Sequence, residues 1–138
     1  PRLVYIMHQI EDRSMDCPGL HGVLAPEQAI EGFRHQGPFL PEHWCILRFK
    51  DEDAGALLMT IHPTIGCWEL MYMGVVHRYR GQGLGKILLK EALQRAQQAS
   101  ANLVLLTVDT NNQPAIRLYE QAGFQTYAER SLYAYLSA

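Results

Sequence analysis

The stretch RGQGLGK, residues 80–86, places three glycines in five positions between an arginine and a lysine. It runs directly into apolar residues with helical spacing, so we expect the glycine turn to begin a helix. Glycines allow consecutive main-chain N–H groups to point at one ligand, and the positive end of a helix dipole favours an anion there. This stretch therefore predicts an anion-binding turn between a strand and a helix, and it restricts the chain to folds that contain such a junction.

Three anion-binding patterns compete for the stretch, and the spacing of its residues decides among them. A phosphate loop of the form GxxxxGK[ST] needs glycine at position 80 and serine or threonine at position 87, where the chain has Arg80 and Ile87. A dinucleotide-binding GxGxxG pattern needs a third glycine where Lys86 stands. The pattern Gln/Arg-x-x-Gly-x-Gly/Ala is filled without a gap by Arg80, Gly83 and Gly85. A glycine turn that only starts a helix is the structural alternative.

The apolar patterns predict an antiparallel meander followed by a strand, helix, strand unit. We expect strands at residues 44–50, 54–62, 69–76 and 103–108, with a hairpin turn at 51–53, and shorter strands at 3–7 and twice within 124–136. We expect helices at residues 26–37, 84–99 and 114–122, the last of them closed by Gly123. This order predicts an α/β (α+β) fold with a mixed sheet and the glycine turn at a strand-to-helix junction.

The length and charge of the chain indicate a single domain and the kinds of partner that it binds. Its 138 residues are the size of one domain with one core. Residues 1–69 carry five Lys/Arg against ten Asp/Glu, and residues 70–138 carry seven against four. The net charge of −2, without interleaved basic and aromatic residues, predicts no nucleic-acid partner.

The cysteines and hydropathy point away from disulfides, metals and membranes. Cys17, Cys45 and Cys67 are widely spaced and lie in or beside apolar segments, so we expect small buried side chains and no metal site. The sequence shows neither a run of roughly 18 apolar residues nor a signal peptide, so we expect a cytoplasmic protein with no membrane partner. Because the chain begins at Pro1, we leave open that it is one domain of a longer or tandem protein.

The glycine stretch, with ELMYMGVV before it and NNQPAIRLYEQAGF after it, resembles the GNAT superfamily of acyl-CoA-dependent N-acetyltransferases. The resemblance covers residues 44–136 in element order, and residues 69–124 carry the motifs. It implies a single GNAT-like domain over residues 1–138, with a mixed, mostly antiparallel central sheet, a splayed pair of parallel strands and flanking helices. Residues 69–124 would form the acetyl-CoA-binding and catalytic core, and residues 1–43, which match only loosely, would form one wall of the acceptor site.

The resemblance also implies which residues bind acetyl-CoA, with no metal. The pantetheine arm would lie between the strands at 69–76 and 103–108, where main-chain groups of Met73 and Val75 would bind it and Gly74 would mark a bulge or a close approach. Asn112 would contact the arm or cap the following helix. His77 stands where the family often has proline. The pyrophosphate would lie on Arg80, Gly81, Gln82, Gly83, Leu84, Gly85 and Lys86.

Two residues are the candidates for catalysis. Glu69, six residues before Val75, matches a strand glutamate that in some members of the family deprotonates the amine through water. The structural alternative is that Glu69 is an exposed strand end. The catalytic alternative is that Tyr72 and a water chain act as the base. Tyr119 in IRLYEQAGF matches the tyrosine that protonates the departing thiolate, and the alternative is packing against Phe124 across the glycine cap. A base is needed because an alkylamine has a pKa of about 10.4.

The expected reaction is direct transfer of an acetyl group from acetyl-CoA to a primary amine. The tetrahedral oxyanion would form near a β-bulge, close to a main-chain N–H around Val75, and no cysteine would act as a nucleophile. The alternative is a non-catalytic acyl-CoA-binding domain, and a nucleotide-binding protein is a more remote one. We expect a small-molecule or peptide amine as acceptor, and we leave open a homodimer or a tandem domain partner.

Overall fold

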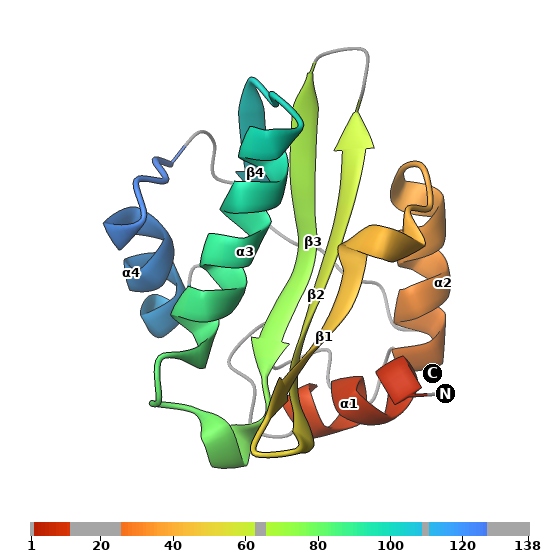
Figure 1. Ribbon diagram of the computed structural model, residues 1–138, viewed down its shortest axis with the longest axis vertical. Helices are drawn as coiled ribbons and strands as arrows, with labels where there is room; N and C mark the ends of the chain where they lie inside the picture. Colours follow the sequence, from red (N-terminus) through yellow and green to blue (C-terminus); the bar gives the residue numbers. More distant parts are fainter. Residues whose placement is uncertain (1, 12–25, 63–65, 109–110, 127–138) are drawn as a thin grey trace, which may run out of the picture.

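The computed structural model describes residues 2–11, 26–62, 66–108 and 111–126, which form one sheet flanked by helices (Figure 1). The sheet has the order β1-β2-β3-β4, in which β1 and β2 and then β2 and β3 pair antiparallel, whereas β3 and β4 pair parallel. The strands are β1 (Trp44–Phe49), β2 (Glu52–His62), β3 (Cys67–Val75) and β4 (Leu103–Leu106). The α-helices are α1 (Arg2–Glu11), α2 (Pro26–Gln36), α3 (Leu84–Gln98) and α4 (Gln113–Gln121), with short 3-10 helices at Pro41–His43 and His77–Tyr79. The predicted mixed α/β fold is confirmed.

The predicted hairpin between β1 and β2 is confirmed, with a shorter turn than expected. Lys50 and Asp51 have positive φ angles of 52° and 62°, as in a two-residue turn that matches the twist of its strands. Glu52 and Asp53, which we expected in the turn, already belong to β2.

The predicted strand at residues 3–7 is wrong, because these residues lie in α1. Ile6, Met7 and Ile10 are buried, and with Leu3 they recur at spacings of three and four residues, which place them on one face of a helix. The strand prediction treated Leu3 to Met7 as an isolated apolar run. It therefore left out Ile10, which completes the helical spacing.

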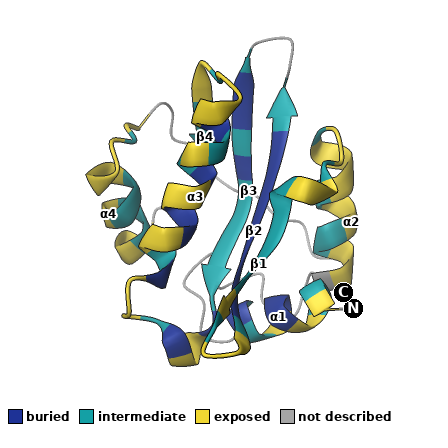
Figure 2. Cartoon of the chain, viewed as in Figure 1, coloured by how far each residue is buried: buried dark blue, intermediate teal, exposed yellow. Residues whose placement is uncertain are grey.

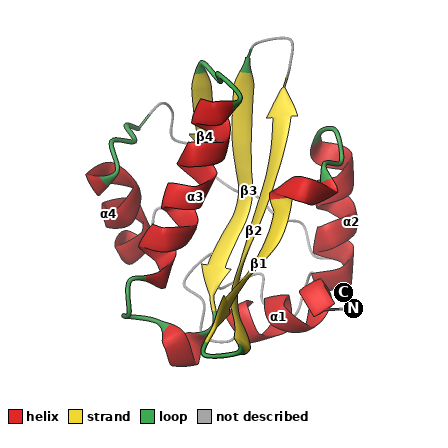
Figure 3. Cartoon of the chain, viewed as in Figure 1, coloured by secondary structure: helices red, strands yellow, loops and turns green. Residues whose placement is uncertain are grey.

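The predicted strands near the C-terminus lie mostly outside the described residues. Residues 124–126 are described and are not part of a strand, and the remainder of that segment is not described. The other predicted helices and strands are confirmed within two residues at their ends (Figure 3).

Two apolar clusters lie on opposite faces of the sheet (Figure 2). On the first face, α3 packs on β2 and β3, and α4 lies beside it. On the second face, Ile6 and Ile10 of α1 pack against Ala54 and Ala56 of β2. These four side chains are almost fully buried, so α1 contributes to the core that supports β3.

A β-bulge in β3 sets which side chains face α2. Leu58 pairs with Tyr72 and the next residue, Met59, pairs with Leu70, so Met71 is the extra residue in β3. The extra residue shifts the alternation of side chains. As a result Tyr72 lies on the same face as Glu69, and its ring is 5.9 Å from that of Phe33 in α2.

Candidate functional site

The parallel strands β3 and β4 separate partway along β3. Their pairing runs from Cys67 opposite Leu103 to Leu70 opposite Leu106. Beyond Leu70, β3 continues to Val75 and pairs there with β2 alone among the described residues. The predicted splayed pair is confirmed, and it leaves one edge of residues 71–75 available to a ligand that can replace a strand.

The glycine turn follows the open end of β3. Gly81 and Gly83 have φ angles of 81° and 80°, a left-handed conformation that glycine adopts without strain. A Cβ atom added at either position would meet no described atom within 4 Å, so backbone conformation rather than space requires glycine there. Gly83 is the N-cap of α3 and has no side chain with which to cap it. The first N–H groups of α3 are thus directed to an exposed turn, which suits a phosphate group.

The guanidinium of Arg80 is directed to main-chain carbonyls beside the turn. Its Nε donates to the Val75 oxygen at 2.9 Å and its Nη2 donates to the Ile10 oxygen at 2.5 Å. Arg80 therefore ties the end of β3 to the end of α1. Its predicted contact with a pyrophosphate stays a prediction, and Lys86, whose side chain is exposed, is the more accessible cation of the turn.

Gly74 allows α1 to approach β3. A Cβ atom at this position would clash with Cγ2 of Ile10. The bulge lies at Met71 rather than at Gly74, and the close neighbour of Gly74 is a side chain of the protein. The packing of α1 is thus enough to require this glycine, and its contact with the cofactor stays a prediction.

The two residues predicted on α4 have structural contacts. Asn112 Oδ1 accepts a hydrogen bond from the N–H of Ala115 at 3.4 Å, so Asn112 caps the helix, one of its two expected roles. The ring of Tyr119 is half-buried and lies 5.8 Å from that of Phe124, across the turn at Gly123. The packing alternative for Tyr119 is therefore observed, and its role toward a thiolate stays a prediction.

Glu69 has two side-chain partners that the sequence analysis missed. His62 Nε2 lies 2.8 Å from Glu69 Oε1, and Gln36 Nε2 donates to Glu69 Oε2. The three side chains come from β2, β3 and α2. The predicted pairing of β2 with β3 held a signal for His62, because on one face of an antiparallel pair a residue also meets diagonal neighbours on the next strand.

The cysteines and the acidic groups do not form a nucleophilic or metal site in the described segments. Burial raises the pKa of the Cys45 and Cys67 thiols, and the charge of Glu69 raises that of Cys67 further, so both stay protonated at neutral pH. Within the described ranges, no group of three or more His, Cys, Asp or Glu side chains could hold a metal ion. Of the helices that the structure describes, none is both long and apolar enough to span a membrane.

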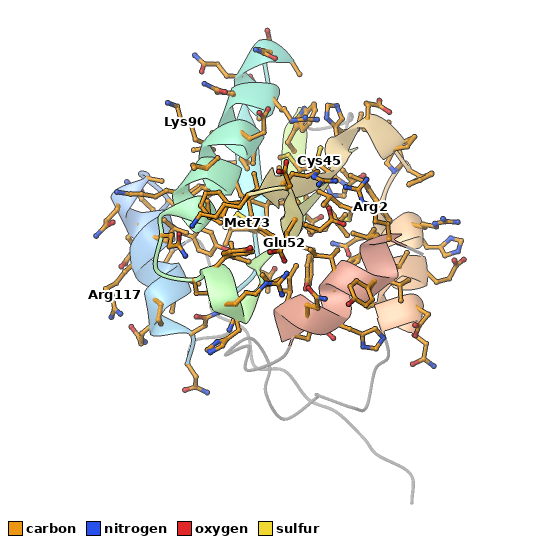
Figure 4. The ribbon with its side chains drawn as sticks, turned by 60° about the horizontal axis from the view of Figure 1, so that its bottom comes forward. Arg2, Cys45, Glu52, Met73, Lys90 and Arg117 are labelled. Carbon is orange, nitrogen blue, oxygen red and sulfur yellow. The ribbon has the colours of Figure 1, made fainter. Side chains whose placement is uncertain are left out.

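A groove of about 500 Å³ runs between α3 and α4 and begins beside the glycine turn. Its lining includes Lys86, Lys90, Gln94 and Leu118. Figure 4 shows Met73 among the central side chains, whereas Lys90 and Arg117 point outward from α3 and α4. The groove therefore has a mostly apolar lining that carries two lysines, Lys86 and Lys90, next to the turn.

Comparisons with known proteins agree with this geometry. The model of the Acetyltransferase (GNAT) family matches residues 7–124. A mycothiol acetyltransferase from Corynebacterium aurimucosum is 35% identical over 104 residues, which cover 75% of this chain and 30% of the relative. The chain thus spans about a third of the length of that relative.

Solved structures show the same fold. A transcriptional regulator from Bacillus halodurans superposes with a TM-score of 0.72 at 21% identity, covering 96% of this chain and 93% of the other. A GNAT family acetyltransferase from Elizabethkingia anophelis, with acetyl-CoA bound, superposes with a TM-score of 0.54 at 19% identity, covering 58% and 52%. The match of the family model over most of the chain identifies it: the chain belongs to the acetyltransferase (GNAT) family.

Proposed function

We propose that this chain transfers an acetyl group from acetyl-CoA to a primary amine by direct attack. The observation that carries the proposal is the separation of β3 from β4 after Leu70 and Leu106, followed at the end of β3 by a glycine turn whose helix has no capping side chain. A pantetheine arm has amide groups that can take the place of strand partners, and a diphosphate can accept hydrogen bonds from the turn.

Different parts of the site would bind the pantetheine arm, the diphosphate and the remaining phosphate of acetyl-CoA. Main-chain groups of Met73 and Val75, next to Gly74, would bind the pantetheine. The diphosphate would lie on the amides of residues 81–86, with Gln82 and Leu84 contributing main-chain groups. The positive charge of Lys86, and of Lys90 one turn further along α3, would attract the remaining phosphate of the cofactor into the groove beside α4.

Acyl transfer needs a site for the oxyanion and a proton for the leaving group. The N–H of a residue around Val75 would stabilise the oxyanion, and the Tyr119 hydroxyl would protonate the thiolate of CoA. Glu69 would assist the removal of the amine proton, since it lies beside the point where the strands separate. Because the two described cysteines are protonated, direct attack by the amine is favoured over a thioester intermediate.

The acceptor site would lie on the α2 side of the sheet, where Glu69 and Tyr72 face. The name of the relative, mycothiol acetyltransferase, favours a small-molecule amine over a peptide. We also propose a cytoplasmic location, and the mass of the chain in solution would test whether it forms a homodimer.

The test is a thermal-shift titration with acetyl-CoA followed by a thiol-release assay over a panel of amines and peptides. We expect acetyl-CoA to raise Tm and at least one amine to release free CoA. Tyr119→Phe is expected to lower kcat by roughly 10²–10⁴ with little change in acetyl-CoA affinity. Tyr5→Phe, at an exposed position of α1, is the matched control and should leave kcat unchanged. Binding without turnover for any acceptor would instead indicate a non-catalytic acyl-CoA-binding domain, and stabilisation by ATP or NAD but not by CoA would overturn both readings.

A further inference from the structure

Glu69 is held from two sides on the face of the sheet that α2 covers. His62 Nε2 lies 2.8 Å from one carboxylate oxygen, and the side-chain amide of Gln36 donates to the other. The side chain of Glu69 is 19% exposed and that of His62 is 34% exposed. Of the two titratable side chains, the imidazole is therefore the one that solvent or a substrate reaches more easily.

The fold builds this cluster from three separate elements. Thr60 pairs with Glu69 across β2 and β3, so His62 is its diagonal neighbour on the same face. The Thr60 hydroxyl donates to the Pro38 oxygen at 2.9 Å, and Gly37 leaves the space for this approach, because a Cβ atom there would lie 2.5 Å from Thr60 Oγ1. These contacts fix the end of α2 and, with it, Gln36.

The hydrogen bonds engage both carboxylate oxygens of Glu69 and one ring nitrogen of His62. A histidine that donates Nε2–H to a carboxylate presents Nδ1 as an acceptor, and the carboxylate holds the ring in that orientation. An imidazole has an ordinary pKa of about 6.5, which suits general-base catalysis near neutral pH.

Glu69 lies next to the opening between the parallel strands, and His62, which pairs with Cys67 nearer the closed end of the ladder, reaches Glu69 through its side chain. Glu69 pairs with Leu105, one position before the last pair of β3 with β4. The titratable neighbour across the strands from His62 is Cys67, whose buried thiol is uncharged at neutral pH. On α2, Gln36 is neutral and His35 is engaged with Glu31 at 3.0 Å. Within the described elements, Glu69 is thus the charged group that contacts His62.

We propose that His62, positioned by Glu69, accepts the proton of the acceptor ammonium in the proposed acetyl transfer, on which this inference rests. One N–H bond of the ammonium breaks, and its proton passes to Nδ1 of His62. The freed electron pair on nitrogen attacks the thioester carbon. When the C–S bond breaks, the Tyr119 hydroxyl gives a proton to sulfur and regains one from the nitrogen. His62 then releases its proton to solvent.

The test is the pH dependence of kcat/KM for the amine between pH 5 and 9. We expect the wild-type kcat/KM to rise with pH through a pKa in the histidine range, and this rise is the limb of the pH profile that the variants test. His62→Gln retains an N–H donor for Glu69 but cannot take a proton, so it should lose that limb and lower kcat/KM by roughly 10²-fold or more. The KM for acetyl-CoA should stay unchanged. Glu69→Gln should keep this rise with pH but lower kcat/KM, because the carboxylate that positions the imidazole is removed.

His35→Gln is the matched control, since it replaces a histidine that also binds a glutamate, on the exposed side of α2. It should leave both kcat/KM and the limb unchanged. His62→Asn provides a second variant should His62→Gln unfold. A wild-type limb in the carboxylate range, or His62 variants that keep the wild-type profile, would overturn this inference and leave the proposed function intact. A wild-type chain that acetylates no amine would overturn both.

Discussion

Leu70 of β3 and Leu106 of β4 form the last pair of their parallel ladder, while β3 continues for five more residues to Val75. The same end of β3 leads through Val76 and a short 3-10 helix into the glycine turn that begins α3. The place where β3 separates from β4 and the uncapped start of α3 are therefore close to each other in the chain. A ligand with an amide-containing arm and a diphosphate matches both parts at once.

The left-handed turn predicts a specific cost for replacing Gly83. Gly83→Ala would place a Cβ atom in an αL conformation, which costs about 1–2 kcal/mol. We expect a matching loss in the free energy of unfolding by urea titration, and weaker acetyl-CoA binding by calorimetry. The control is Gly32→Ala, which lies inside α2 with no described atom within 4 Å of the added Cβ. It should raise stability by about 0.5–1 kcal/mol and leave acetyl-CoA affinity unchanged. Equal effects of the two variants would contradict the role given to the turn.

The contact between Gly74 and Ile10 predicts non-additive mutations. Gly74→Ala would force a methyl group into Cγ2 of Ile10, and such overpacking typically costs about 1–3 kcal/mol. Ile10→Ala removes a buried side chain and should by itself cost about 2–5 kcal/mol. In the double variant the clash is gone, so the loss of unfolding free energy should be smaller than the sum of the two single losses. Additive losses would show that α1 does not pack on β3 in this way.

Asn112 should act as a helix cap whatever else it does. Asn112→Ala should lower the free energy of unfolding by about 0.5–2 kcal/mol, whereas Asn112→Asp, which keeps an oxygen acceptor, should stay near the wild type. Binding of acetyl-CoA to the two variants separates the two expected roles. An alanine variant with full stability and reduced affinity would favour contact with the cofactor over capping.

The acidic start of β2 predicts a loss of stability at low pH. Hydrogen bonds from Tyr79 and then Arg78 lower the pKa of Glu52, and the hydrogen bond from Arg2 lowers that of Asp53. A lowered folded-state pKa means that the stabilisation is complete above the unfolded-state values, about 4.3 for Glu and 3.9 for Asp, and disappears as pH falls through the folded-state values.

Urea midpoints measured from pH 7 to pH 2 should therefore decline below about pH 4.5. The double variant Glu52→Gln, Asp53→Asn should decline less steeply over the same range. Parallel curves for the two proteins would show that these exposed pairs contribute nothing to stability.

Periodicity predicted the elements that are amphipathic over several turns or strand repeats. Residues 84–99 and the hairpin around Lys50 and Asp51 were found in this way. Residues 3–7 were assigned to a strand because five apolar residues fit either period, and only burial of Ile10 decides for a helix.

The candidate site was predictable only in part. The glycine turn follows from spacing, and the splayed strands were implied by the family resemblance. The contact of Gln36 with Glu69 depends on the approach of Gly37 to Thr60, which has no residue pattern that reveals it. The contact of His62 follows from the register of β2 against β3, for which the strand pattern held a partial signal. The contact of Gln36 is set by the tertiary packing of one helix end, so it could not be found from the sequence alone.

The most direct test of the account is a crystal structure of the chain with acetyl-CoA. We predict that the pantetheine arm lies between β3 and β4 beyond Leu70, bound by main-chain groups of Met73 and Val75, and that the diphosphate accepts hydrogen bonds from the amides of residues 81–86. A complex in which β3 and β4 close along their whole length, with the cofactor bound elsewhere and the glycine turn empty, would contradict it.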